Sequence, residues 1–460
     1  MTAPAMFRKV LIANRGAVAA RVVRALRALG VASVAVYSDA DADLPYVREA
    51  DEAYALGPAT PQHSYLNITA LLGVLQRSGA DAVHPGYGFL SENADFARAV
   101  EAYGATFIGP KADWIDLMGH KTKARDFMAA RGIPVAPSSP VYTAEWADLS
   151  PEQRASITGV GYPVLVKPAA GGGGIGMLPA HDDEGLARAW DTARSLAQRS
   201  FSSVEIYVER LVQKPRHVEF QVLADRYGQV RVLFERDCSV QRRHQKVLEE
   251  APAPGIPRDL LDATCERIAQ VLGSFGYDVI GTVEMLYDTV DQRFHFLEMN
   301  TRLQVEHAVT EEVTGVDLVC AQVRLAAGQR MKDVLPIAPS LNGHAIEARL
   351  YAEDPQRFFP SPGPLTVFEL PQGPGLRTET GYAQGAQVTP YYDPMLAKII
   401  AHGQDRETAR QRLLTALESV QIQGVKTNLA FLLDALRSDD FVSGQVHTEM
   451  VRSLRPQLFK

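Results

Sequence analysis

Residues 298–306 read Glu298-Met-Asn-Thr-Arg-Leu-Gln-Val-Glu306, a stretch in which polar and apolar side chains alternate. Successive side chains of a β-strand point to opposite faces, so this period predicts a strand with one functional face and one mostly apolar face. An ordinary half-solvated strand has the same period. Carboxylate, amide and guanidinium groups gathered on one face favour a functional site. That face would carry Glu298, Asn300, Arg302, Gln304 and Glu306.

The segment before this stretch is a predicted hairpin. Residues 281–287 and 294–298 form its two strands, and a turn connects them. If the turn centres on Asp291, Glu284 lies opposite Glu298. Like charges directly across a hairpin are destabilising, and a hard cation between the two carboxylates would reverse that effect.

The chemistry of the hairpin predicts a metal site. Asp, Glu and Asn oxygens suit magnesium, which usually completes its shell with phosphate and water. Glu284, Glu298 and Asn300 are therefore the predicted ligands of a nucleotide-bound metal. At ~3.3 Å per residue, a straight strand would separate Glu298 from Glu306 by about 26 Å. If both residues serve one centre, the chain must bend after Asn300.

Length and composition exclude several classes of protein. A chain of 460 residues is expected to form two or three domains. Apolar content of 46% and charged content of 22% are ordinary for a globular protein, and a net charge of −7 gives no reason to expect nucleic-acid binding. We find no signal-peptide pattern and no apolar run of the ~20 residues that a membrane span needs. Cys238, Cys265 and Cys320 form no metal-ligand spacing, so a reducing compartment, by default the cytoplasm, is expected.

The first hundred residues alternate predicted strands and helices. Residues 9–13 and 33–37 read as buried strands, and the apolar residues of 18–29 mark one face of a helix between them. This is a Rossmann-like βαβ unit. The acidic loop after the second strand belongs to the dinucleotide-binding fingerprint, but the first turn has only Gly16 instead of three glycines, so binding of NAD is disfavoured.

Two glycine-containing loops follow predicted strands. Residues 85–93 follow the strand 82–84, at the end where open α/β sheets bind ligands, although a well-packed turn would read the same way. Residues 168–176 follow a strand that ends in Lys167. They satisfy GxGxxG formally, but the expected helix does not follow and no Gly-Lys-Ser/Thr is present. What remains is a glycine hairpin whose amides can wrap phosphates.

These motifs resemble biotin carboxylase, the ATP-grasp component of biotin-dependent carboxylases, over residues 12–447. Other ATP-grasp enzymes share the glycine loop and the paired carboxylates. The elements Gln241-Arg-Arg-His-Gln-Lys246 and Arg302-x-Gln-x-Glu-His307 are more specific, although a short basic run alone is usually a solvated patch. The segments that carry the resemblance are His84-Pro-Gly-Tyr-Gly-Phe-Leu-Ser-Glu-Asn93, residues 236–246, residues 298–307 and Tyr391-Tyr-Asp-Pro-Met395.

The resemblance implies a fold of the α/β (α+β) class. It would be an ATP-grasp fold with an N-terminal Rossmann-like domain (1–120), an ATP-grasp domain (121–340) and a C-terminal mixed domain (341–460). A mobile glycine-rich lid would lie at about 138–211. From their spacing alone, Lys246 and His244 are expected to share one face of an extended segment. The implied reaction uses ATP to phosphorylate bicarbonate to carboxyphosphate, which releases carbon dioxide for attack by biotin.

The resemblance also implies roles for single residues. Glu306 would deprotonate bicarbonate, because bicarbonate is a poor nucleophile until it loses its proton. Arg302 and Lys246 would neutralise charge as two anions approach each other. Arg349 would stabilise negative charge on the ureido oxygen of biotin. The bicarbonate and biotin site would comprise Lys246, Arg302, Gln304, Val305, Glu306, Arg349 and Tyr87. The ATP site would comprise Lys121, Lys167, Gly171, Gly172, Gly173, Gly174, Glu209, Val212, His217, Gln241, His244 and His447, with Val446 beside it.

The implied cofactors are ATP and Mg²⁺, or Mn²⁺ in its place, with biotin as a substrate. No Ala-Met-Lys-Met motif is present, so the biotin carboxyl carrier protein and the carboxyltransferase are expected as separate chains. A homodimer acting in acetyl-CoA carboxylation for fatty acid biosynthesis is expected.

Ala17, Ala170 and Ile175 depart from the usual pattern of this family. These departures could alter the affinity for nucleotide or the closure of the lid. Another ATP-grasp ligase with an amino acid or purine precursor as acceptor, or a non-catalytic nucleotide-binding protein, remains an alternative.

Overall fold

The computed structural model describes residues 5–169, 176–201, 203–242 and 245–456. The residues of the sequence analysis that lie outside these ranges are Ala170, Gly171, Gly172, Gly173, Gly174, Ile175 and His244.

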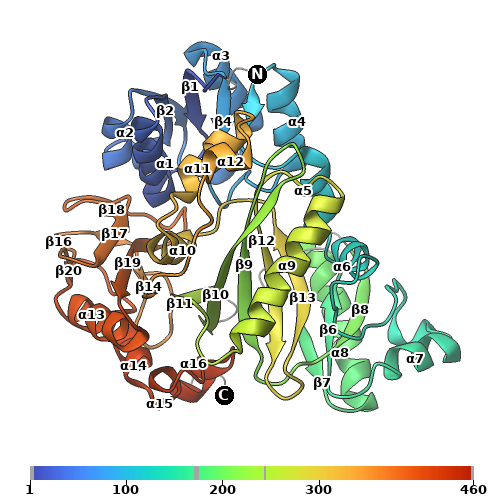
Figure 1. The fold of residues 1–460 in the computed structure, drawn as a ribbon. Helices are drawn as coiled ribbons and strands as arrows, with labels where there is room; N and C mark the ends of the chain where they lie inside the picture. The colour runs from blue at the N-terminus through green and yellow to red at the C-terminus, as the bar shows by residue number, and fades with distance from the viewer. Residues whose placement is uncertain (1–4, 170–175, 202, 243–244, 457–460) are drawn as a thin grey trace.

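The N-terminal part is a five-stranded parallel sheet in the order β3-β2-β1-β4-β5 (Figure 1). Val10 and Ile12 pack with α1, whereas Leu11 packs with α3 and α4, so helices bury both faces. The predicted Rossmann-like unit is therefore confirmed. Its strands are β1 (Lys9–Ile12), β2 (Ala32–Ser38), β3 (Glu52–Gly57), β4 (Ala82–His84) and β5 (Thr106–Phe107). Its helices are α1 (Gly16–Ala28), α2 (Pro45–Glu49), α3 (Ile68–Ser78), α4 (Ala94–Ala102) and α5 (Ala112–Gly119).

The segment predicted as a lid contains a small antiparallel sheet of its own, in the order β7-β6-β8. β6 and β7, which flank the glycine loop, pair antiparallel, whereas residues 170–175 of the predicted glycine hairpin lie outside the described residues. In Figure 1 this unit, with α7 and α8, lies at the lower right of the molecule. Its elements are α7 (Pro151–Thr158), β6 (Val164–Pro168), β7 (Leu178–Ala180), α8 (Asp183–Phe201) and β8 (Ile206–Arg210), and α6 (Lys121–Ala129) precedes them.

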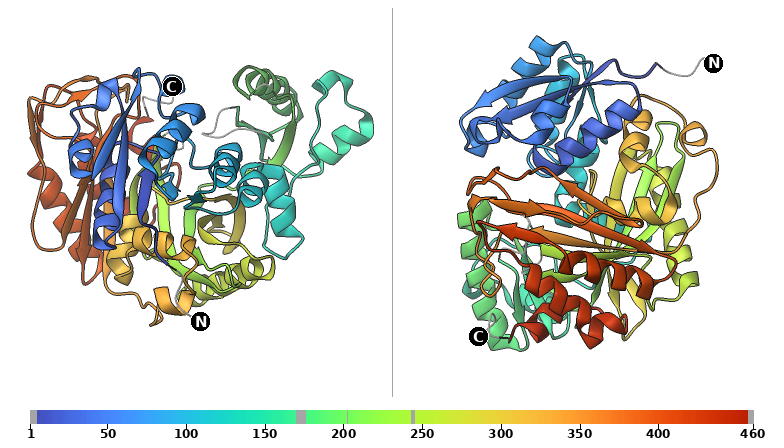
Figure 2. Two further views of the ribbon diagram at one scale, coloured as in Figure 1. Left: turned by 90° about the horizontal axis from the view of Figure 1, so that it is seen from above. Right: turned by 90° about the vertical axis from the view of Figure 1, so that its left-hand side faces the viewer.

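An eight-stranded antiparallel sheet forms the centre of the molecule, in the order β13-β12-β9-β10-β11-β14-β19-β17. The pairing of β11 with β14 carries the sheet across the predicted boundary at residue 340. Figure 2 shows the C-terminal strands lying beside the N-terminal unit. The strands are β9 (Arg216–Ala224), β10 (Val230–Arg242), β11 (Gln245–Ala251), β12 (Val279–Asp288), β13 (Arg293–Asn300), β14 (His344–Tyr351), β17 (Leu376–Thr380) and β19 (Met395–Gly403).

The remaining elements cover this sheet or extend its C-terminal end. Leu413, Leu417 and Val420 are buried, as their helical spacing predicts. Among the described residues, no helix combines the length and the apolar character that crossing a membrane requires. The helices are α9 (Arg258–Ser274), α10 (His307–Thr314), α11 (Leu318–Ala326), α12 (Met331–Val334), α13 (Arg406–Glu418), α14 (Leu429–Arg437), α15 (Asp439–Val442) and α16 (Met450–Leu454). The short strands are β15 (Gly363–Pro364), β16 (Val367–Glu369), β18 (Gln387–Val388) and β20 (Gln421–Gln423).

The two faces of the C-terminal half of this sheet differ in chemistry. Along β14, Ile346, Ala348 and Leu350 pack into an apolar cluster that also contains residues of α13 and α14. The alternating residues Glu347 and Arg349 point to the other face, which is also buried. The alternation along β14 therefore places charged side chains inside the protein.

The predicted hairpin is confirmed, because Glu284 of β12 is the register partner of Glu298 of β13. The prediction of one strand from residue 298 to 306 is wrong. β13 ends at Asn300, at the edge of the sheet, and the amide of Thr301 donates to the Glu92 side chain (3.2 Å) instead of to a neighbouring strand. The expected bend after Asn300 is confirmed, and it brings Glu306 to the start of α10.

Candidate active site

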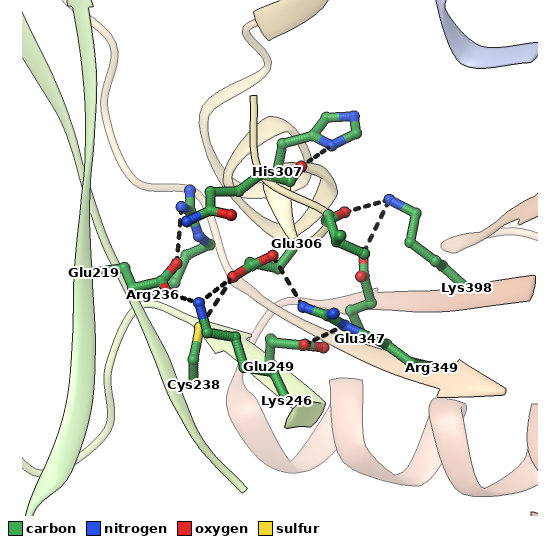
Figure 3. A network of polar contacts seen from close by, with 12 residues as sticks. Glu219, Arg236, Cys238, Lys246, Glu249, Glu306, His307, Glu347, Arg349 and Lys398 are labelled. Carbon is green, nitrogen blue, oxygen red and sulfur yellow. Dashed lines mark hydrogen bonds and ion pairs between the residues drawn. The ribbon is translucent and has the colours of Figure 1, made fainter. Parts of the chain in front are cut away.

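Lys246 is the centre of a buried network of charges (Figure 3). Its Nζ lies 2.8 Å from Glu306 Oε1 and 2.9 Å from Glu284 Oε1, and it also contacts Glu219. The register pairs Lys246 of β11 with Gln241 of β10, so the basic run 241–246 belongs to two antiparallel strands. The predicted shared face of Lys246 and His244 stays a prediction, because His244 lies outside the described residues. One cation therefore joins carboxylates from two strands and from the start of a helix.

Glu306 lies between two cations. Lys246 contacts one of its oxygens, and Arg349 Nη2 lies 2.9 Å from the other. Burial and the nearby Glu219 oppose ionisation, but Lys246, Arg349 and Arg236 outweigh them and lower the pKa of Glu306. Glu306 is therefore an ionised carboxylate that can accept a proton.

Glu284 is held by neutral donors as well as by Lys246. Asn300 Nδ2 (2.7 Å) and Gln304 Nε2 (2.9 Å) donate to its Oε1, and His217 Nε2 lies 2.9 Å from its Oε2. Burial lowers the pKa of His217, but the carboxylates of Glu284 and Glu219 outweigh burial, and the pKa rises to about 9. The His217 ring thus lies against the carboxylates of Glu284 and Glu219, whereas sequence analysis assigned His217 to the ATP site.

The residues of the hairpin fit a hard divalent cation. Burial raises the pKa of Glu298, and the charge of the facing Glu284 raises it further. Two facing carboxylates are therefore costly to ionise together. A cation between them would remove that cost, and carboxylate oxygens are suitable ligands. Among the described residues, the ligand atoms of His217, Glu219 and Glu284 lie within 4.8 Å of one another, as do those of Glu219, Cys238 and Glu306. Burial raises the pKa of the Cys238 thiol, so Cys238 is not a ligand for magnesium.

Arg302 is fixed by the loop 85–93. Its Nε lies 2.8 Å from Glu92, while its other nitrogens donate to Gln304 (2.6 Å) and Asn300 (3.0 Å). The loop is also a packed turn, because the carbonyl of Tyr87 accepts from Asn14 (2.8 Å). The packed-turn interpretation of this loop is therefore confirmed, and ligand binding at the loop stays a prediction.

The predicted nucleotide side is built differently. Lys167 of β6 lies 3.2 Å from Glu209 of β8. Burial lowers the pKa of Lys167, but Glu209 and Tyr207 together raise it by more, so the net shift is upward. Burial lowers the pKa of Lys121 by more than Glu298 raises it.

The C-terminal segment reaches the same region, since the amide of Thr448 donates to the carbonyl of Pro215 (3.0 Å), near Val212. His447 lies 4.0 Å from Asp440 and accepts from the amide of Glu449 (3.2 Å). Gln241 contacts the His217 ring (2.9 Å).

Sequence analysis missed several residues of this network. Glu219 is fully buried and contacts Lys246 and Arg236. The alternation of polar His217, Glu219 and Gln221 with apolar residues, which is typical of a strand, was a signal that could have found it. The other missed residues are Glu92, Arg236, Glu249, Glu347 and Lys398.

The fold and this site define an ATP-grasp enzyme, and comparison with known proteins identifies its kind. Three family descriptions match in succession: "Biotin carboxylase, N-terminal domain" (6–115), "Carbamoyl-phosphate synthase L chain, ATP binding domain" (120–334) and "Biotin carboxylase C-terminal domain" (347–453). The chain is 46% identical to biotin carboxylase 2 of Bacillus subtilis, over 97% of this chain and 99% of that one. It is also 46% identical to the biotin carboxylase of Haemophilus influenzae, over 95% of this chain and 97% of that one.

Solved structures agree. The biotin carboxylase domain dimer of the Hydrogenobacter thermophilus 2-oxoglutarate carboxylase, in complex with MgADP, ADP and bicarbonate, has a TM-score of 0.91 at 40% identity and 99% coverage of both chains. A biotin carboxylase complex with β,γ-ATP from Campylobacter jejuni has a TM-score of 0.92 at 38% identity, covering 97% of this chain and 99% of that one.

The chain belongs to the biotin carboxylase family. It is an ATP-dependent ligase that performs the biotin carboxylation half-reaction of a biotin-dependent carboxylase. The predicted family, fold and enzyme class are confirmed, and the two alternatives, another ATP-grasp ligase or a non-catalytic protein, are not.

Proposed function

We propose that this chain carboxylates biotin on a separate carrier protein, using bicarbonate and ATP through carboxyphosphate, with Glu306 as the general base. The observation that carries this proposal is the position of Glu306 between Lys246 (2.8 Å) and Arg349 (2.9 Å). An ionised carboxylate beside two cations can take a proton from bicarbonate while the cations hold the resulting anion.

The first step joins two anions. Once Glu306 holds the proton, a carbonate oxygen attacks the γ-phosphorus of ATP, the bond to the β,γ-bridging oxygen breaks and ADP leaves. Lys246 and Arg302 would neutralise charge on the two reactants, because both side chains already reach the Glu284–Asn300–Gln304 group. The 304–306 segment would supply the remaining contacts to bicarbonate.

Glu284, Glu298 and Asn300 would hold magnesium, which when bound bridges the ATP phosphates and offsets their charge. Lys121, Lys167 and the glycine loop would contact the phosphates. Glu209, Val212, Val446 and His447 would lie on the adenine side, with His217 and Gln241 close to the nucleotide.

The second step transfers the carboxyl group. Carboxyphosphate breaks its carbon–oxygen bond to give carbon dioxide and a phosphate anion. The phosphate takes the proton of the ureido nitrogen of biotin, and that nitrogen then attacks the carbon dioxide. Negative charge builds on the ureido oxygen, and Arg349 would stabilise it. Glu249 lies 2.6 Å from Arg349 Nε and so orients the guanidinium from behind. Tyr87 would lie beside the biotin ring.

The assembly and the pathway are part of this proposal. We infer a cytoplasmic homodimer, domains at 1–120, 121–340 and 341–460, and a biotin carboxyl carrier protein and a carboxyltransferase on separate chains. Acetyl-CoA, used in fatty acid biosynthesis, is the proposed final acceptor. Similar chains are named as subunits of pyruvate carboxylase and of methylcrotonoyl-CoA carboxylase, which act on other acceptors. The identity of the acceptor should therefore be tested first.

Two experiments test these proposals. Phosphate release from ATP should require bicarbonate and should increase when free biotin is added. ATP turnover that is indifferent to bicarbonate would contradict the proposed reaction. For the acceptor, the chain would be combined with a carrier and with carboxyltransferases for acetyl-CoA, pyruvate, 2-oxoglutarate or methylcrotonoyl-CoA. Carboxylation of a substrate other than acetyl-CoA would overturn only the pathway.

A further inference from the structure

Lys398 is a fully buried lysine for which the reaction described above has no use. It lies on β19, directly opposite Arg349 of β14, and shares the charged face of the sheet (Figure 3). A buried ammonium is costly unless partners replace its water.

The ammonium of Lys398 reaches acceptors on three different elements. Its Nζ lies 2.5 Å from the carbonyl oxygen of Val305 in the loop before α10. It lies 2.9 Å from Glu379 Oε2 on β17 and 3.6 Å from Glu347 Oε2 on β14. Lys398 therefore donates a hydrogen bond to the Val305 carbonyl and forms ion pairs with the carboxylates of Glu379 and Glu347.

The contact with Val305 bears on the catalytic base. The peptide unit that carries the Val305 carbonyl also carries the amide nitrogen of Glu306, and this unit is planar. Holding that carbonyl therefore fixes the point from which the Glu306 side chain leaves the backbone. The preceding carbonyl, of Gln304, is held by Nδ1 of the His307 ring (2.7 Å). Two successive carbonyls before the base are thus fixed by buried side chains.

Glu379, the carboxylate closest to Lys398, is itself held by two arginines. Glu379 contacts Arg377 on its own strand, and Arg21 Nε of α1 lies 3.7 Å from it. Both arginines also pair with Glu311, at 2.6 Å and 3.0 Å. Lys398 is therefore attached to a frame of charges that does not include the residues proposed to touch substrate.

We propose that Lys398 is a positioning residue for the carboxylation half-reaction: through the Val305 carbonyl it sets the place of the Glu306 carboxylate between Lys246 and Arg349. This inference rests on the proposed role of Glu306. Lys398 would act on the proton-transfer step and not on nucleotide binding, because its contacts lie on the loop and the C-terminal strands.

The test is Lys398→Met, assayed by bicarbonate-dependent phosphate release and by binding of MgADP. Turnover should fall by about 10²-fold, as expected when a catalytic group is displaced by about 1 Å. The dissociation constant for MgADP should stay within about twofold. The melting temperature should also fall, because Glu379 loses its buried counter-charge.

A double variant, Lys398→Met with Glu379→Gln, separates positioning from stability. It removes the uncompensated negative charge, and Glu347 can take up a proton because burial raises its pKa to about 7. The melting temperature should recover while turnover stays low, since the Val305 carbonyl still lacks its donor. Turnover that returns together with the melting temperature would overturn the inference.

Two further variants complete the design. Ile399→Val changes a buried residue of the same strand that packs on the apolar side, and it should keep its turnover. Loss of turnover in this control to the level of Lys398→Met would also overturn the inference. Loss in Glu306→Gln with normal turnover in Lys398→Met would refute the positioning role alone. Normal turnover in both would refute the proposed role of Glu306 as well.

Discussion

The pKa of a buried lysine shifts in opposite directions in two regions of the molecule, the carboxylate-rich centre around Lys246 and the nucleotide side around Lys121. Burial opposes the charge of Lys246, yet Glu219, Glu284 and Glu306 raise its pKa well above the ordinary value. At Lys121 burial prevails, and the pKa is lowered. The first lysine therefore stabilises the fold by joining three carboxylates, whereas the second costs stability where it stands.

This difference separates groups that hold the site together from groups that await a substrate. If it is correct, variants of the centre should lose both catalysis and stability. A variant of Lys121 should lose affinity for ATP and little else, whereas Lys167 of the nucleotide side forms a buried ion pair with Glu209 and resembles Lys246. The tests below are ordered from the largest expected effect to the smallest.

Glu306→Gln tests whether the centre contains the base. The amide keeps the shape of the side chain but accepts no proton, so biotin carboxylation should fall by a factor on the order of 10²–10⁴. Binding of MgADP, measured by calorimetry, should be unchanged, because Glu306 lies among Lys246, Arg349 and Cys238. Turnover equal to that of the parent protein would remove Glu306 from the mechanism.

Lys246→Met tests the stabilising half of the comparison. It leaves Glu219, Glu284 and Glu306 without their shared cation, and removal of one partner from a buried ion pair costs about 3–5 kcal/mol. Urea unfolding should show this loss as a lower midpoint with an unchanged slope. A variant as stable as the parent would mean that His217 and Arg236 already balance the carboxylates.

Glu347→Gln extends the comparison to the charged face of the C-terminal strands. Burial raises the pKa of Glu347 to about 7, although Lys398 and Arg349 lower it, and Glu379 and Glu306 add to the rise. Its register partner Glu249 also carries a raised pKa. A carboxyl with a raised folded-state pKa binds its proton more tightly when folded, so its contribution is fully present below about pH 4.3 and is lost as pH rises through 7.

Glutamine does not titrate, so the stability of Glu347→Gln relative to the parent should improve between pH 5 and pH 8, by on the order of 2–3 kcal/mol. Unfolding in urea at the two pH values measures this. Glu379→Gln is the matched control, because Lys398 and Arg377 hold the pKa of Glu379 well below its ordinary value against the effect of burial. That variant should lose more stability at high pH than at low pH. The same pH trend in both variants would contradict the assignment.

Glu284→Ala and Glu298→Ala test the metal ligands, which lie between the two regions. Each variant should raise the magnesium concentration for half-maximal ATP hydrolysis by about tenfold or more, equivalent to ~1.4 kcal/mol. The raised pKa of Glu298 reflects the nearby Glu284 charge after burial, so Glu284→Ala should also make Glu298 easier to ionise. An unaltered metal requirement in both variants would refute the hairpin as the metal site.

The sequence predicted most of the fold because its signals are local. A turn centred on Asp291 predicted Glu284 opposite Glu298, and the βαβ alternation predicted the N-terminal sheet. The prediction of a strand from residue 298 to 306 was wrong for a physical reason. Alternation specifies a strand only where a neighbour supplies hydrogen bonds, and β13 lies at the sheet edge, where Glu92 captures the amide of Thr301.

The parts of the site that were missed depend on contacts between distant segments. Lys398 contacts Val305 across 93 positions, and Arg236 contacts Thr310 across 74. No local pattern marks such a pair, because an isolated lysine in an apolar strand has the same sequence whether its partner is a carbonyl or water. Glu219 was the exception, since its strand and its period were both visible.

Lys121→Met is the smallest expected effect and the sharpest test of the nucleotide side. Removing a cation that burial already disfavours should leave the free energy of unfolding within about 0.5 kcal/mol of the parent or raise it slightly. The Michaelis constant for ATP should rise, by up to about tenfold if ~1.4 kcal/mol of phosphate attraction is lost. The catalytic rate at saturating ATP should change less, because Glu306 and Lys246 are untouched. Measured beside Lys246→Met, a large loss of stability in Lys121→Met would show that both lysines hold the fold together, and the contrast between the two regions would disappear.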